Sequence, residues 1–216
     1  MTKRSDIIDD SSANTAKYGL IYTKKCGWVD LGHANPTGAE GLWNKIKSEV
    51  NENGTKSGYY RISYSQKMGN KHLKVGVRKV YDIKKGNSLA DKKSIALTIF
   101  LDVSKEFETM QGNWLFSKFT NSSFSAEDLV SNLIGFYRAV EPNKEYISIC
   151  EPVSKNIALA IWDKYGAVGD NKNTTTIPYI YPLPSSSSST PLRTPLPLFF
   201  NSITPVKQGV LFSEAK

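Results

Sequence analysis

Two predicted strands and a helix meet around the sequence Tyr22-Thr-Lys-Lys-Cys-Gly-Trp-Val-Asp-Leu-Gly-His33. Tyr18–Tyr22 and Trp28–Leu31 are rich in aromatic and branched side chains, which is typical of strands or buried extended segments. Asn35-Pro36 follows closely, and an Asn N-cap with Pro in the first helical position predicts that a helix begins there. His33 is therefore expected at a strand-to-helix junction, where a polar group can be held without being buried unpaired.

Helical and strand periods alternate along the next part of the chain. The predicted helix ends at Asn53-Gly54 and has the apolar stripe Ala39, Leu42, Trp43, Ile46 and Val50. Tyr59–Tyr64 and Leu73–Tyr81 alternate and have β-rich composition. They predict a hairpin that turns around Met68-Gly-Asn70.

Three further helices complete the predicted fold. Residues 91–114 predict a long amphipathic helix with the stripe Ile95, Ile99, Val103, Phe107, Met110 and Trp114. Ser125 as N-cap and Asp128 three positions later form a capping box, which predicts a second helix buried through Leu129, Leu133, Ile134 and Tyr137. Glu151-Pro152 opens a third, which Gly166 ends. We predict an α+β fold in which a small antiparallel sheet packs against three or four helices.

The 216 residues suit one globular domain followed by an irregular Pro/Ser-rich tail. We expect a flexible N-terminal segment at residues 1–17 and a single globular domain at residues 18–169. From Asp170 the composition changes to Asn, Thr, Pro and Ser, so residues 170–216 are predicted to contribute little to the core. Leu196-Pro-Leu-Phe-Phe200 is the exception, because an exposed apolar cluster would promote association unless it docked on the domain.

The net charge of +8 favours an anionic partner: an acidic envelope polymer, an anionic membrane face or nucleic acid. The basic residues are scattered, and residues 67–85 are the most basic region. No helix-turn-helix, zinc-finger or RNA-recognition signature accompanies them, so nucleic acid is not the favoured partner. The charged first residues and the absence of long apolar runs predict cytoplasmic synthesis without a signal peptide or membrane span. Any export would then use a specialised secretion system.

The cysteine and histidine counts limit the metal and disulfide chemistry. Cys26 and Cys150 are interpreted as free thiols, because two cysteines in a chain of this size form no disulfide framework. His33 and His72 are too few for a zinc site of familiar spacing, so a divalent metal would need carboxylate ligands as well.

His33 can act as acid, base or metal ligand near neutral pH, and Asp30 could orient its second nitrogen. Cys26 would become a nucleophile if the imidazole stabilised its thiolate. The alternative is purely structural: His33 caps the next helix, Asp30 shapes a turn and Cys26 fills the core. For Cys26 the structural interpretation is favoured.

The acidic candidates have structural alternatives too. Glu108 lies beside the apolar stripe of the long helix and could face a cavity as a general base or ligand, or it could simply be solvated. Glu127 and Asp128 could be helix-capping carboxylates and nothing more. Asn132 lies inside an apolar run, where a buried amide needs a specific partner.

Three blocks of the chain carry a resemblance: Gly27-Trp-Val-Asp-Leu-Gly-His33, Val103-Ser-Lys-Glu-Phe-Glu108 with Gln111-Gly112, and Ser123-Phe-Ser-Ala-Glu-Asp-Leu-Val-Ser-Asn-Leu-Ile-Gly135. Over residues 18–140 they resemble an uncharacterised bacterial domain family, many of whose members are described as envelope lipoproteins. The resemblance implies the polar set Asp30, His33, Glu108, Ser125, Glu127, Asp128, Ser131 and Asn132.

The chain departs from that family in two ways. Phe107 stands where the family tends to have a histidine, which weakens a two-histidine metal site. We recognise no lipoprotein signal in its first residues, so envelope anchoring is not expected to carry over. The family has no established reaction, and the resemblance therefore points to a site rather than to a function.

A histidine and a glutamate in one site would suit acid–base or metal-assisted hydrolysis. We expect a hydrolase acting on a bacterial envelope component, as an antibacterial effector would. His33 and Glu108 would be acid/base residues or ligands, and Asp30 would orient His33. Ser125, Glu127, Asp128 and Asn132 would position water or substrate.

Two alternatives belong to other classes. In the first, the chain is a non-catalytic adaptor whose Pro-rich tail binds a protein partner. In the second, the basic hairpin binds nucleic acid. The oligomeric state is left open.

Overall fold

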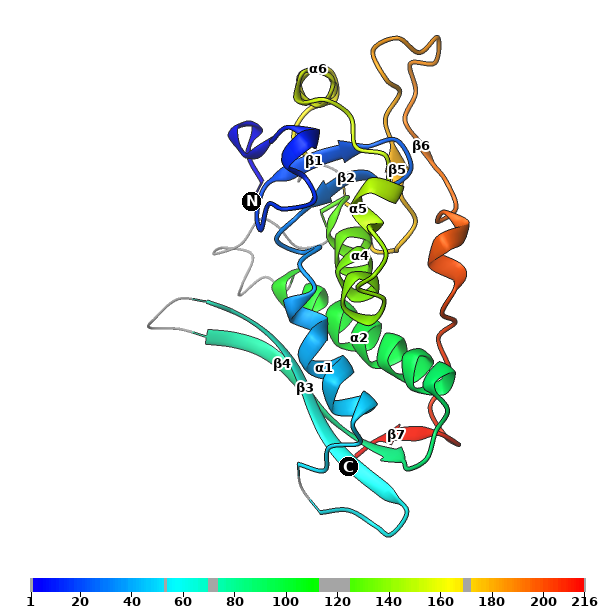
Figure 1. The fold of residues 1–216 in the computed structure, drawn as a ribbon. Coiled ribbons are helices and arrows are strands. Elements are labelled where there is room, and N and C mark those ends of the chain that lie inside the picture. The colour runs from blue at the N-terminus through cyan, green and yellow to red at the C-terminus, as the bar shows by residue number, and fades with distance from the viewer. Residues whose placement is uncertain (1, 53, 70–73, 113–124, 169–171, 216) are drawn as a thin grey trace.

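The strands pair into antiparallel sheets and helices pack beside them, as Figure 1 shows for this computed structural model. The structure describes residues 2–52, 54–69, 74–112, 125–168 and 172–215. Within these ranges the strands are β1 Leu20–Thr23, β2 Gly27–Asp30, β3 Tyr59–Gly69, β4 Lys74–Lys84, β5 Tyr179–Ile180, β6 Leu192–Arg193 and β7 Phe212–Glu214. The α-helices are α1 Thr37–Lys47, α2 Leu89–Gly112, α4 Asp128–Val140, α5 Tyr146–Ile149 and α6 Lys155–Tyr165. The predicted α+β class is confirmed.

The larger core lies between the β3–β4–β7 sheet and the helices α1, α2 and α4 (Figure 1). The β3–β4 hairpin is paired in register from Tyr59 with Lys84 to Gly69 with Lys74. Side chains alternate across it, so one face carries the buried residues Tyr60, Ile62, Tyr64, Tyr81 and Ile83. Helix α2 packs on this face and buries Ile95, Ile99, Val103 and Phe107.

A second core forms where β1 and β2 meet α6. Tyr22 and Trp162 both pack edge to face against Trp28, with ring centroids 5.2 Å and 5.9 Å away. Ile7 belongs to the same cluster and is fully buried, and it forms a parallel bridge with Leu20. Part of the segment at residues 1–17, which the sequence suggested to be flexible, is thus integrated into the core.

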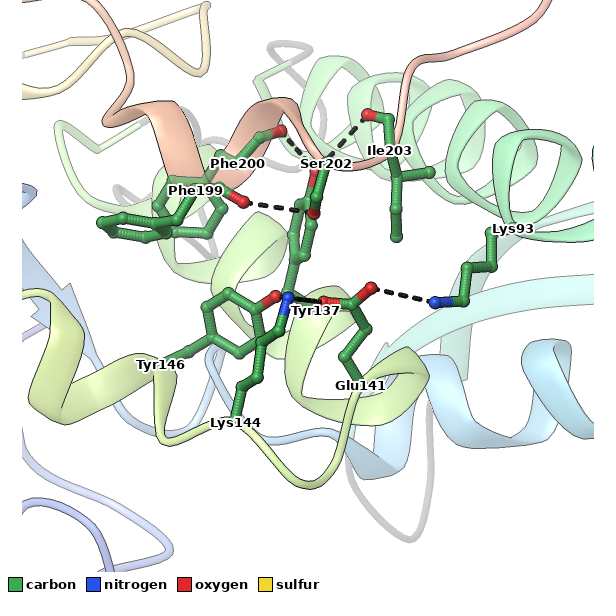
Figure 2. Close-up of polar contacts among 9 residues, drawn as sticks. All are labelled: Lys93, Tyr137, Glu141, Lys144, Tyr146, Phe199, Phe200, Ser202 and Ile203. Carbon is green, nitrogen blue, oxygen red and sulfur yellow. Dashed lines mark hydrogen bonds and ion pairs between the residues drawn. The ribbon is translucent and has the colours of Figure 1, made fainter. Parts of the chain in front are cut away.

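The C-terminal segment crosses the surface of α4 before it reaches the sheet (Figures 1 and 2). The hydroxyl of Tyr137 on α4 donates to the carbonyl of Phe200, and the Phe200 ring stacks on Tyr146 at 6.0 Å. Further along, β7 pairs with β4, and Phe212 lies opposite Ile83. The expectation that residues 170–216 contribute little to the core does not match this packing, because Tyr181, Phe200, Ile203 and Phe212 are all buried.

Several boundaries differ from those that the sequence suggests. Helix α1 begins at Thr37 and stops before Val50, whose side chain is 43% exposed. Helix α6 begins at Lys155, because Pro152 is bridged to Thr23 of β1. Trp114 and the residues Ser123 and Phe124 of the third block lie outside the described residues, as does His72.

Within the described part of the chain, no helix combines the length and the apolar character that crossing a bilayer requires.

Candidate functional site

A cavity of about 400 Å³ opens where the β2–α1 turn, β3, α2 and α4 approach one another. His33, Glu108 and Asn132 all line it, and they come from three distant parts of the sequence. Its other polar wall residues are Asn35, Thr37, Ser65, Gln66 and Lys67, and its aromatic ones are Tyr18, Phe100 and Phe107. The cavity thus brings together one candidate from each of the three sequence blocks.

Asp30 shapes the turn that presents His33. Its Oδ1 accepts from the backbone N–H of Gly32 at 2.7 Å and of His33 at 3.4 Å. Its own N–H donates to the hydroxyl of Ser131 on α4 at 3.0 Å. The turn is therefore tied to α4, and Asp30 holds backbone rather than the imidazole.

The partner of the His33 ring is Asp128, at the first position of α4. His33 Nδ1 lies 3.5 Å from Asp128 Oδ1, and the histidine side chain is 41% exposed while Asp128 is buried. Asp128 Oδ2 accepts from the backbone N–H of Ser125 at 2.7 Å, a contact expected of the predicted capping box. The predicted N-cap is wrong, however, because α4 begins at Asp128 with Glu127 rather than Ser125 as its N-cap. The sequence suggested Asp30 as the group that orients the ring. The approach of α4 in space gives that contact to Asp128 instead.

The carboxyl groups around Asp128 form a buried cluster, which we call the carboxylate cluster: Asp30, Glu108, Glu127 and Asp128. Burial, followed by the charges of Glu127 and Glu108, raises the pKa of Asp128 to about 9. Burial, together with the charge of Asp30, raises the pKa of Glu127 to about 7. Asp128 therefore retains its proton at neutral pH, and Glu127 titrates close to neutrality.

The carboxyl group of Glu127 stands out because it has few hydrogen-bond partners among the described residues. Its Oε1 accepts from the Thr2 hydroxyl at 3.3 Å. Its Oε2 is buried, and among the described residues it has no hydrogen-bond partner. A buried polar atom of this kind costs stability, which makes Glu127 a candidate for a role other than stabilising the fold.

Glu108 brings a buried carboxyl from α2 to the same place. It is 1% exposed, and Ser104 one turn earlier is fully buried. The side-chain amide of Gln66 on β3 donates to the Ser104 hydroxyl at 2.7 Å. Glu108 faces the cavity rather than solvent, which answers the question that the sequence left open.

The remaining candidates divide by position. Asn132, one turn after Asp128, is half-buried and lines the cavity. The Ser131 hydroxyl accepts from the backbone N–H of Asp30, whereas the backbone N–H of Ser125 donates to Asp128 and Ser125 is bridged to Lys172. Cys26 is buried away from the cavity. Among the described residues, no three His, Cys, Asp or Glu side chains are placed to hold a metal ion.

Gln66 is a site residue that the sequence argument missed. It follows Tyr60, Ile62 and Tyr64 at every second position of β3, so its side chain belongs to the inward-facing set. A polar residue continuing an inward apolar row is a signal that could have identified it.

Gly135 on α4 sets the distance between the helix and the His33 turn. A Cβ there would lie 2.8 Å from the His33 carbonyl oxygen and 3.1 Å from the Asn35 carbonyl oxygen, both backbone atoms. We expect Gly135→Ala to lower the free energy of unfolding by about 1 to 3 kcal/mol in urea titrations, because backbone has to move. Gly41→Ala on α1, where nothing lies within 4 Å of the new Cβ, should instead raise it by about 0.5 to 1 kcal/mol. Equal effects of the two variants would contradict this account of the turn.

The model of a protein family described as "Protein of unknown function (DUF4056)" matches residues 3–161. The match covers the cavity and the whole carboxylate cluster, and the expected relation to an uncharacterised domain family is confirmed. No curated protein and no solved structure matches the chain.

Proposed function

The chain belongs to the DUF4056 family of unknown function, and we propose that its cavity is an acid–base hydrolytic site for an anionic component of the bacterial envelope. The observation that carries the proposal is the carboxylate cluster behind His33. Burying several carboxyl groups together destabilises a fold, and pKa values displaced toward neutrality are what proton transfer requires.

In this proposal His33 and Glu108 are the groups that meet the substrate. One of them takes a proton from the attacking water, and the other gives a proton to the leaving atom of the bond that breaks. Asp128 orients the imidazole through Nδ1, as a positioning residue. Glu127 lies behind His33 and Asp128, and its charge influences the protonation of Asp128. Asn132 and Gln66 offer amide groups to bound substrate.

The charge distribution supports an anionic polymer as substrate. The chain carries a net charge of +8, and the raised pKa of Asp128 keeps that carboxyl group neutral beside the cavity. Lys67 lies at the cavity wall and is exposed. Elsewhere on the hairpin, Lys79 is paired with Asp102 and Glu106, and Arg61 of β3 with Asp82. This internal pairing reduces the basic surface available to nucleic acid.

The test is hydrolysis of isolated cell-wall sacculi and of purified anionic envelope glycopolymers, followed by detection of soluble fragments. We expect the full chain to release fragments, and His33→Ala and Glu108→Gln to lower the rate at least about 100-fold. Glu106→Gln is the matched control, because it makes the same change on the same helix at an exposed side chain. His33→Ala should keep its melting temperature within a few degrees, since the half-exposed imidazole loses only its 3.5 Å contact with Asp128, worth about 1 kcal/mol or less.

The outcomes separate the function classes. Equal rates for Glu108→Gln and Glu106→Gln would remove Glu108 from the reaction. Binding of sacculi without fragment release, unchanged by either variant, would make the protein a non-catalytic module. Binding of nucleic acid in gel-shift assays, with no envelope activity, would favour the basic hairpin instead.

A further inference from the structure

Two thiols from distant parts of the chain meet outside the carboxylate site. Cys26 lies in the turn between β1 and β2, and Cys150 directly follows α5. Both are buried free cysteines, and their Sγ atoms are 3.2 Å apart. The sequence predicted two free thiols but did not predict that they would be neighbours.

Backbone contacts hold the two cysteines together. The N–H of Lys25 donates to the carbonyl of Cys150 at 3.2 Å, and the N–H of Val153 donates to the carbonyl of Tyr22 at 2.9 Å. The Lys25 ammonium group also pairs with Glu151 at 2.9 Å. The sulfur atoms are therefore neighbours because two chain segments are paired around them.

We propose that Cys26 and Cys150 form an intramolecular disulfide when the chain folds in an oxidising environment. The oxidant is a disulfide. A thiolate of one cysteine attacks it and releases one oxidant thiol, and the thiolate of the other cysteine then attacks the mixed disulfide and releases the second. Two protein thiols thus become one S–S bond, and the oxidant disulfide becomes two thiols. An S–S bond is about 2.05 Å long, so the sulfur atoms must approach by roughly 1 Å.

Burial determines when the bond forms. The neighbouring Cys150 thiol and burial raise the pKa of the Cys26 thiol, so few thiolates exist in the closed fold. We therefore expect oxidation to accompany folding rather than to follow it. In a reducing compartment both residues stay thiols, and in an oxidising one the bond ties the β1–β2 turn to the end of α5. This modification does not depend on the hydrolytic function.

The experiment refolds the urea-denatured full chain in mixtures of oxidised and reduced glutathione, with dithiothreitol as the reduced reference. We expect the oxidatively refolded monomer to have no thiols that react in denaturant and an intact mass lower by about 2 Da. The bond should form at glutathione ratios that leave the denatured chain mostly reduced, because the fold places the thiols together. The oxidised monomer should melt roughly 4 to 16 °C above the reduced one.

The variants make the result specific. Cys26→Ser and Cys150→Ser should each abolish the difference between oxidised and reduced melting temperatures. Two reactive thiols, a glutathione adduct or a disulfide-linked dimer as the main product would overturn the proposal. So would an oxidised monomer that melts no higher than the reduced chain. The thiol and mass measurements use only the wild-type chain, so a variant that fails to fold leaves the proposal testable.

Discussion

A chain that ends at Asp170 is expected to lose its cooperative fold. Tyr181, Phe200, Ile203 and Phe212 all lie beyond that point, and each is at least 95% buried. Burying a large apolar side chain contributes about 1.5 to 3 kcal/mol, so the set contributes about 6 to 12 kcal/mol. That sum is as large as the whole stability of a typical domain, about 5 to 15 kcal/mol. The truncation also removes β7 and leaves β4 as a sheet edge.

Circular dichroism and thermal melting of the truncated and full chains measure this effect. Phe200→Ala and Leu198→Ala provide the matched pair, because Phe200 stacks on Tyr146 while Leu198 is 85% exposed. We expect the first substitution to lower the free energy of unfolding by about 3 to 5 kcal/mol. The second should stay within about 0.5 kcal/mol of the wild type. A truncated chain that melts cooperatively within a few degrees of the full one would restore residues 18–169 as an independent domain.

The C-terminal segment shows which information a local sequence pattern lacks. The hairpin and the long helix have a hydrophobic period, because residues at regular intervals along each element face the same core. The C-terminal segment instead buries single large apolar residues at irregular intervals, and Tyr181, Phe200 and Phe212 each meet a different part of the domain. Its composition resembles that of a disordered tail, and only tertiary packing distinguishes the two.

The contacts within the candidate site also depend on tertiary packing, so the sequence predicted them only in part. Local signals indicated the strand-to-helix junction of His33 and the hydrogen bond between the Ser125 N–H and Asp128, and both are present, although α4 begins at Asp128 and not next to Ser125. The contact between those two residues depends on how closely α4 approaches the turn, which Gly135 permits. Proximity in sequence suggested Asp30 as the partner, and the Asp30 side chain is occupied by the turn itself. The sequence could indicate candidate residues but not which of them would face one another.

The pH dependence of stability is the second large effect, and its sign follows from the raised pKa values of the carboxylate cluster. Asp128 titrates near 3.8 when unfolded and at about 9 in the fold, and Glu127 near 4.5 and at about 7. Between those limits the folded chain holds protons that the unfolded chain has released, so stability falls as pH rises. Each group lowers the free energy of unfolding by up to about 1.4 kcal/mol per pH unit. Stability is therefore expected to be highest near pH 5 and to fall steadily toward pH 9.

Acid conditions set the other limit. Glu141 contacts Lys93, Lys144 and Tyr146, and the ammonium and hydroxyl hydrogen bonds lower its pKa to about 2 despite burial (Figure 2). A carboxyl with a lowered pKa stabilises the fold above its unfolded pKa, and this contribution is lost as pH falls from about 4.5 toward 2. Carboxyl groups with raised pKa values make stability fall toward alkaline pH, and those with lowered pKa values make it fall toward acid pH. The maximum of stability therefore lies between the two ranges.

Asp128→Asn isolates the contribution of the cluster. The amide keeps an acceptor for the Ser125 N–H but cannot ionise, so the variant should come closest to the wild type near pH 4 and exceed its stability at pH 8. Urea unfolding at pH intervals from 4 to 9 would measure both slopes. Asp82→Asn is the control: Arg61 lowers the pKa of Asp82, so its loss should destabilise the fold at neutral pH and leave the alkaline slope unchanged. A wild-type stability that is flat or rising from pH 5 to 9 would mean that the cluster is ionised in the fold. The proposed acid–base role requires protonated carboxyl groups behind His33. That result would therefore also remove the electrostatic basis of the proposed hydrolase.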